Sequence, residues 1–158
     1  MYSDLEIFDK ANAVMNNVAL SEKQSCCTSI YSKRWFNISK DGVLNYEGRT
    51  TANYYDAKTG IVIIINRAIK PDKTVINICL DDSKLIHVLK MSVKSSRNDR
   101  QIKTKHYLEK KVDNKGDYRK LSEIDSSDSS IGAANEMIMR LINEMLDSIQ
   151  STYEYDYM

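Results

Sequence analysis

The sequence predicts an α+β fold: an antiparallel β-meander with an N-terminal helix, a helix after the meander, a second basic hairpin and a long C-terminal helix. Three observations predict it. Apolar and polar residues alternate in short runs between Thr28 and Leu80, apolar residues near both chain ends recur at helical spacing, and the connections are too short for parallel crossovers. The 158 residues are expected to form one domain over 1–150 and an acidic, aromatic tail over 151–158.

The first element is predicted to be a helix that begins after Ser3. Ser3 can cap it, Glu6 stands at the capping-box position, and apolar residues from Leu5 to Val18 form a rough stripe. The pattern predicts an end near Asn16 and Asn17 or by Ser21.

The meander is predicted from alternation and turn residues. Asp41-Gly42 is a hairpin signal, and the stretch from Asp56 to Gly60 resembles a turn. The expected strands are Thr28–Ile38, Val43–Glu47, Arg49–Tyr55, Ile61–Ile69 and Thr74–Leu80. The third of these ends at the turn before Ile61, and Ile61–Ile69 is β-branched on both faces, which predicts a central strand.

The second half of the chain is predicted to hold two helices and a hairpin. Asp81, Asp82 and Ser83 can cap a helix that continues to about Val93. A hairpin is expected around residues 113–116, with strands over 101–112 and 117–124. The final helix is expected over 131–149, because its apolar residues keep helical spacing, and a serine and aspartate stretch can cap it.

Composition excludes several classes of protein. Three cysteines, of which Cys26 and Cys27 are adjacent, cannot build a disulfide framework, so reduced thiols are expected. The acidic N-terminus does not resemble a signal peptide, and the run Ile61–Ile65 is too short to span a membrane. We therefore expect a cytoplasmic protein with no membrane partner. The abundance of Lys, Asn, Ser, Ile and Tyr is typical of an AT-rich genome and hints at a virus, phage, plasmid or low-GC bacterium.

No catalytic pattern is present in the sequence. The five glycines are too dispersed for a nucleotide-binding loop, and neither His87 nor His106 belongs to a metal-binding pattern. A zinc cluster or a Cys79–histidine nucleophile would have to be assembled by the fold, without support from spacing. The expectation is a non-catalytic protein without cofactor or metal, and an enzyme stays open only through a site that the fold assembles.

Charge is strongly segregated along the chain. Residues 1–83 carry 10 basic and 10 acidic side chains, residues 84–120 carry 12 basic and 4 acidic, and residues 121–158 carry 1 basic and 8 acidic. Such segregation indicates a polyanionic ligand, a partner or self-docking, although a solvated basic face beside an acidic helix also accounts for it.

The basic segment contains the strongest candidate for a binding surface. In the strand expected over 101–112, Lys103, Lys105, Tyr107 and Lys111 share one face, with Glu109 among them. Lysines beside a tyrosine on a sheet surface suit phosphates and a stacked base, whereas lysines on edge strands can also serve solubility alone. The earlier strands add further basic and aromatic candidates, which are Lys33, Trp35, Arg49 and Tyr55.

The C-terminal tail is the second candidate for an interaction. It alternates aromatic and acidic residues and includes Tyr153, Tyr155, Asp156 and Tyr157. A frayed terminus explains this composition. Negative charge combined with aromatic rings also suits a nucleic-acid mimic or a peptide that recruits a protein partner.

The order of these elements is similar to that of the Whirly-like single-stranded DNA-binding proteins of the transcription-cofactor and phage type. The similarity is carried by the meander over 28–80, the segment Leu80–Leu85, the basic hairpin and the final helix, and by the strand–turn–strand of residues 38–44. The resemblance implies curved sheets that grip single strands without strict sequence preference, and oligomers assembled through helices.

The leading expectation from the sequence is non-catalytic binding of single-stranded nucleic acid. The alternative is a phage- or plasmid-type interaction module or inhibitor of a host enzyme, whose acidic C-terminal region mimics nucleic acid. A homo-oligomer is also expected, because Met137, Met139 and Leu146 widen the apolar stripe of the final helix beyond what one sheet contact needs.

Overall fold

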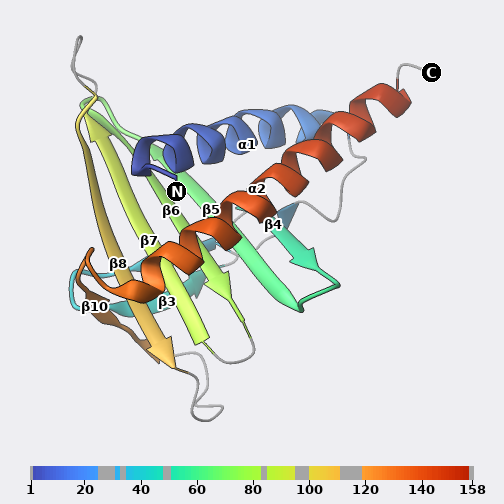
Figure 1. Ribbon diagram of the computed structural model, residues 1–158. Helices are drawn as coiled ribbons and strands as arrows, with labels where there is room; N and C mark the ends of the chain where they lie inside the picture. The colour runs from blue at the N-terminus through green and yellow to red at the C-terminus, as the bar shows by residue number, and fades with distance from the viewer. Residues whose placement is uncertain are drawn as a thin grey trace.

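The computed structural model describes residues 2–24, 31–32, 35–47, 51–82, 85–94, 100–110 and 119–156. Two helices lie on one face of a large antiparallel sheet, and a small sheet lies on the other face (Figure 1). The α+β class and the antiparallel sheet predicted from the sequence are therefore confirmed.

The two sheets divide the strands unequally. Within the described residues, the large sheet has seven strands in the order β1-β4-β5-β6-β7-β8-β10, and the small sheet has three in the order β2-β3-β9. The strands are β1 Tyr31–Ser32, β2 Trp35–Ile38, β3 Val43–Glu47, β4 Thr51–Asp56, β5 Ile61–Ile69, β6 Lys73–Asp81, β7 Leu85–Lys94, β8 Ile102–Lys110, β9 Arg119–Lys120 and β10 Ser122–Ile124. The helices are α1 Asp4–Gln24 and α2 Ser129–Asp156.

The helix-covered face of the large sheet holds the main core. Alternate residues of β5, β6 and β7, such as Ile63, Ile78 and Leu89, are buried against both helices, which also pack against each other. The capping box at the start of α1 is present, because the Glu6 backbone N–H donates to the Ser3 hydroxyl and the Ser3 N–H to the Glu6 carboxylate.

Polar contacts fix each helix on the sheet. The Arg67 guanidinium of β5 donates to the Asn12 side chain of α1 over 2.8 Å. The Arg140 guanidinium of α2 donates to the buried Asp56 carboxylate over 2.9 Å, and Thr59 and Arg140 together hold the pKa of Asp56 below its usual value.

A second core lies between the two sheets. Ile38, Leu44 and Leu121 of the small-sheet layer pack on Val88 and Tyr107 of the large sheet. The predicted turn at Asp41-Gly42 joins β2 to β3, and Gly42 has a φ of +85°.

The structure corrects the helix predicted over residues 81–93. These residues include β7, which pairs with β6 on one side and β8 on the other. Leu85, Ile86, Leu89 and Val93 fit a helical stripe, but the first half of β7 is buried on both faces, so its apolar residues fit a strand as well. Asp82 belongs to the turn between the two strands, where its backbone N–H donates to Leu85 O.

Three further expectations differ from the structure. The meander is divided between two sheets, because β3 pairs with β2 and β9, and among the described residues neither β2 nor β3 pairs with β4. Helix α1 continues past Ser21 to Gln24, and α2 continues past its expected end at residue 149 to Asp156. The turn of the basic hairpin, at residues 113–116, lies outside the described residues.

The surplus apolar residues of α2 are covered within the chain. Met139 is buried, and Met137 and Leu146 pack at the margin of the main core. The homo-oligomer stays a prediction, but these residues no longer supply a reason for it. Neither described helix has a segment apolar enough and long enough to cross a bilayer.

Candidate nucleic-acid interface

The register of β5 to β8 places polar and basic residues in one region of the sheet face that carries the small sheet. Directly opposite residues on neighbouring antiparallel strands point to the same face, and we call each such set a rung. From the small sheet toward the open end, the rungs are Ile64, Cys79, Val88 and Tyr107; then Asn66, Asn77, Lys90 and Lys105; then Ala68, Val75, Ser92 and Lys103; then Lys73 and Lys94. The first of these rungs continues to Glu123 of β10, opposite Tyr107. Apart from that carboxylate, the face changes from apolar beneath the small sheet to basic at the open end.

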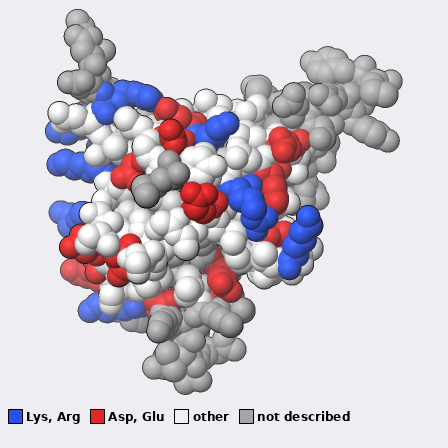
Figure 2. Space-filling model, in the orientation of Figure 1, with Lys and Arg blue, Asp and Glu red and all other residues white. Residues whose placement is uncertain are grey.

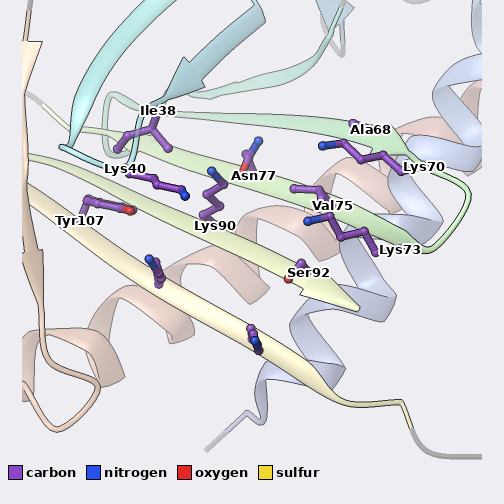
Figure 3. A pocket seen from close by; sticks show the side chains of 12 residues that line it. Ile38, Lys40, Ala68, Lys70, Lys73, Val75, Asn77, Lys90, Ser92 and Tyr107 are labelled. Carbon is purple, nitrogen blue, oxygen red and sulfur yellow. The ribbon is translucent and has the colours of Figure 1, made fainter. Parts of the chain in front are cut away.

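A groove of about 340 Å³ lies in this region (Figure 3). We call it the lysine groove. The described residues that line it include no carboxylate and six lysines, which are Lys40, Lys70, Lys73, Lys90, Lys103 and Lys105. Ile38 and Lys40 contribute from the β2–β3 hairpin, whereas the other lysines belong to β6, β7, β8 or the end of β5.

Lys90 is the groove lysine on which the charges of the neighbouring lysines act together. It is half-buried, and its pKa is lowered first by burial and then by repulsion from Lys105, Lys70, Lys73 and Lys40. Bringing like charges together costs free energy, and an anion in the groove would offset that cost. The electrostatics of the groove therefore favour an anionic ligand.

Two buried polar atoms of the lining residues lack a partner. The Tyr107 hydroxyl and Asn77 Oδ1 have no hydrogen-bond partner among the described residues. Tyr107 is 1% exposed, and burial raises the pKa of its phenol, so the group stays a neutral donor. Buried polar groups are nearly always satisfied, and a polar ligand or ordered water in the groove would satisfy these two atoms.

The structure brings together only part of the surface predicted from the sequence. Lys103 and Lys105 line the groove as expected. Tyr107 shares their face, but its ring is buried beneath the small sheet and cannot stack on a base, so that predicted role is wrong. Tyr55 is 61% exposed but pairs with Val62 near the opposite end of β5, away from the groove.

The remaining predicted residues cannot be placed. Lys33, Arg49 and Lys111 lie outside the described residues, and so does the side chain of Trp35, although β2 contains its backbone. In the C-terminal region, α2 includes Tyr153, Tyr155 and Asp156, of which only the backbone is described, and Tyr157 lies outside.

The prediction from sequence missed Lys40, Lys70, Lys73 and Lys90. Lys90 was missed because residues 85–93 were assigned to a helix. A strand there, paired in sequence order with its neighbours, would have placed Lys90 opposite Lys105. The turn between β5 and β6 would then have brought Lys70 and Lys73 to the same end of the sheet.

A second cluster of titratable residues lies on the helix-covered face. His87 Nε2 lies 3.4 Å from His106 Nδ1, and both rings are buried. Burial, then repulsion from His106, lowers the pKa of His87 to about 4, and burial also lowers the pKa of His106. Among the described residues, no three His, Cys, Asp or Glu side chains are placed to share a metal ion.

Acidic residues gather on the exposed side of α2. Glu136, Glu144 and Asp147 border a surface hollow there, and the Arg140 guanidinium beside them already binds Asp56 and Glu144. Figure 2 shows acidic and basic side chains mixed over the helix-covered face, with a row of Lys and Arg along the edge where β8 lies.

Comparisons with protein-family models, with curated proteins and with solved structures find no match for this chain. The similarity to Whirly-like proteins is thus carried by the sequence pattern alone. A function has to be inferred from the lysine groove itself.

Proposed function

We propose that this protein binds single-stranded nucleic acid without catalysis, through the lysine groove. The observation that carries this proposal is the convergence of six lysines, with no carboxylate among the described lining residues, around the half-buried Lys90. Lysines bind phosphates as point charges, which supplies affinity without reading a sequence.

The length of the groove suits a short stretch of one strand. Three intervals separate the Tyr107 rung from the Lys73 rung, and alternate residues of a strand are about 7 Å apart, so the face extends about 20 Å. At about 3.4 Å per nucleotide of a stacked strand, this length accommodates about six phosphates. A hollow in a sheet also receives one backbone more easily than the convex surface of a duplex.

This proposal differs in one respect from the surface expected from sequence. The described lining residues include no exposed aromatic ring, so binding would be dominated by phosphate contacts and not by base stacking. We therefore expect weak sequence preference and strong dependence on salt.

The test is fluorescence anisotropy with labelled single strands at a series of salt concentrations. The parent should bind, and log K should fall linearly with log salt. The double variant Lys103→Ala, Lys105→Ala should bind more weakly, with a salt slope smaller by about 0.7 for each phosphate that a lysine no longer neutralises. The matched control Lys10→Ala, Lys58→Ala removes the same charge from α1 and from the β4–β5 turn, outside the groove, and should keep the parental slope. Equal slopes for the two double variants would contradict the proposal.

The second candidate is a protein-interaction module that acts through the acidic C-terminal region. It is favoured by the exposed acidic side of α2, where Arg140 is already occupied by Asp56 and Glu144. Deleting residues 151–158 separates the candidates. A strand-binding protein should keep its affinity for nucleic acid, since α2 lies across the sheet from the groove, whereas an inhibitor should no longer bind its protein target and should bind no nucleic acid in either form.

A further inference from the structure

The lysine groove has a blind end. The rung that contains Val88 and Tyr107 is buried beneath Ile38 and Leu44 of the small sheet. One rung farther on, Lys90 and its neighbours line the groove. A strand that runs along the lysines toward Tyr107 therefore meets the small sheet and must end there.

The wall at this end is firmly held. The Leu121 backbone N–H donates to Gly42 O over 2.7 Å, which ties the β2–β3 turn to the segment between β9 and β10. The approach is so close that a Cβ on Gly42 would lie 2.0 Å from Leu121 O. The turn, which carries Lys40, is thus held in place, and the end of the groove keeps its shape.

An unpartnered donor lies at the blind end. The Tyr107 hydroxyl has no hydrogen-bond partner among the described residues, and the side chain is only 1% exposed. Figure 3 shows this hydroxyl directed toward the part of the groove that holds Lys40 and Lys90. The lysines of the groove are donors too, and the carboxylate of Glu123, which lies opposite Tyr107 on β10, forms no hydrogen bond with this hydroxyl, so an anionic oxygen in the groove would supply the acceptor.

We propose that the blind end binds the terminal phosphate monoester of a single strand, with Tyr107 donating a hydrogen bond to a phosphate oxygen and with Lys40, Lys90 and Lys105 balancing its charge. The inference rests on the proposed function and narrows it to strands that carry a phosphate at one end. A monoester has a charge of about −1.5 to −2 at pH 7, more than an internal phosphodiester, which suits a site where three lysines converge. The exposed Lys40 side chain can change rotamer within nanoseconds to admit the phosphate.

The experiment compares four labelled single strands of one sequence: 5′-phosphorylated, 3′-phosphorylated, hydroxyl at both ends, and circular. The parent should bind one of the phosphorylated strands at least about tenfold more tightly than the hydroxyl-ended strand, the gain expected for a charge-assisted hydrogen bond. The circle should bind like the hydroxyl-ended strand. Equal affinity for all four strands would overturn this inference and leave the proposed function intact, whereas binding of none would overturn the proposed function as well.

Two conservative variants assign the preference to the hydroxyl. Tyr107→Phe should show no preference for a phosphorylated end and should keep the parental affinity for the hydroxyl-ended strand. Tyr54→Phe is the matched control, because the Tyr54 hydroxyl bonds to Glu144 on the helix-covered side, and it should retain the preference. A full preference in Tyr107→Phe would exclude this hydroxyl as the donor and overturn the inference.

Thermal unfolding of the free variants gives an independent measurement. Removing a buried hydroxyl that has no partner should raise Tm by about 2 to 4 °C in Tyr107→Phe. Removing the bonded hydroxyl of Tyr54 should instead lower Tm. A lower Tm in Tyr107→Phe would show that its hydroxyl is satisfied within the protein, which would remove the basis of the inference.

Discussion

At the scale of single residues, His87 and His106 link stability to pH. Their rings meet edge to face in the buried layer beneath the helices. A proton on either ring would introduce a charge where water is excluded. Asp128, at the start of α2, favours the charged form of His87, and Asp4, at the start of α1, favours that of His106, but burial is the larger effect on each.

We therefore expect the free energy of unfolding to decrease as the pH falls. The unfolded chain binds a proton at His87 with a pKa near 6.5, whereas the folded protein binds it only near pH 4, so acid favours unfolding. Above about pH 6.5 His87 is neutral in both states, so its titration does not lower the free energy of unfolding. The loss due to His87 grows as the pH falls from about 6.5 toward 4. Between pH 7 and pH 5 the decrease due to His87 should be about 2 kcal/mol.

Urea unfolding at these two pH values measures the effect. The variant His87→Leu places an apolar side chain at this buried position of β7 and removes the titrating group. Its free energy of unfolding should therefore depend less on pH. A variant with the full parental pH dependence would show that His87 is not responsible.

At the scale of elements, the β2–β3 hairpin determines where the groove ends. Its turn depends on Gly42, whose φ of +85° and close approach to Leu121 both exclude a side chain. Gly60, in the β4–β5 turn, has a similar φ of +75°, but a Cβ there would meet nothing within 4 Å. A side chain at Gly60 would therefore introduce backbone strain alone, whereas a side chain at Gly42 would introduce strain together with a clash against Leu121.

Gly42→Ala should destabilise the protein by about 2 to 5 kcal/mol, which combines the strain of a left-handed alanine with the displacement of the turn. Gly60→Ala should cost only about 1 to 2 kcal/mol, since strain alone applies. Equilibrium unfolding in urea measures both changes. Equal destabilisation by the two substitutions would show that contact with Leu121 does not hold the hairpin in place.

At the scale of the whole molecule, charge is arranged by face. The lysine groove lies on the face that carries the small sheet, and the acidic side chains of α2 lie on the helix-covered side. The groove lysines and the acidic side chains of α2 are therefore separated by the sheet and do not neutralise each other directly. The lysines of the groove consequently repel one another in the free protein.

The free protein should be stabilised by moderate salt. Raising sodium chloride from about 20 to about 200 mM shortens the screening length from about 20 Å to about 7 Å, which weakens repulsion among the lysines, so Tm should rise. Lys90→Met should raise Tm at low salt and reduce the response, whereas Lys58→Met, in the exposed β4–β5 turn, should leave it unchanged. A Tm that does not respond to salt in the parent would contradict mutual repulsion among the groove lysines.

Features that depend on near neighbours could be predicted from the sequence. The bounds of β5 were predicted as the structure has them, and the capping box of Ser3 and the turn at Gly42 were predicted correctly. Each depends on side-chain periodicity, a cap or a turn residue within a few positions. The common face of Lys103 and Lys105 follows in the same way from strand alternation.

The tertiary structure decided what covers each face. β7 is a strand because β6 and β8 pair with it, although its apolar residues also fit a helix. Tyr107 points as predicted but is buried, because Ile38 and Leu121, far from it in the sequence, lie over it. The sequence by itself determined the α+β class, most of the local elements other than β7, and the direction of alternate side chains in the strands. The groove was decided by pairing and packing between segments that are distant in the chain, which no local pattern encodes.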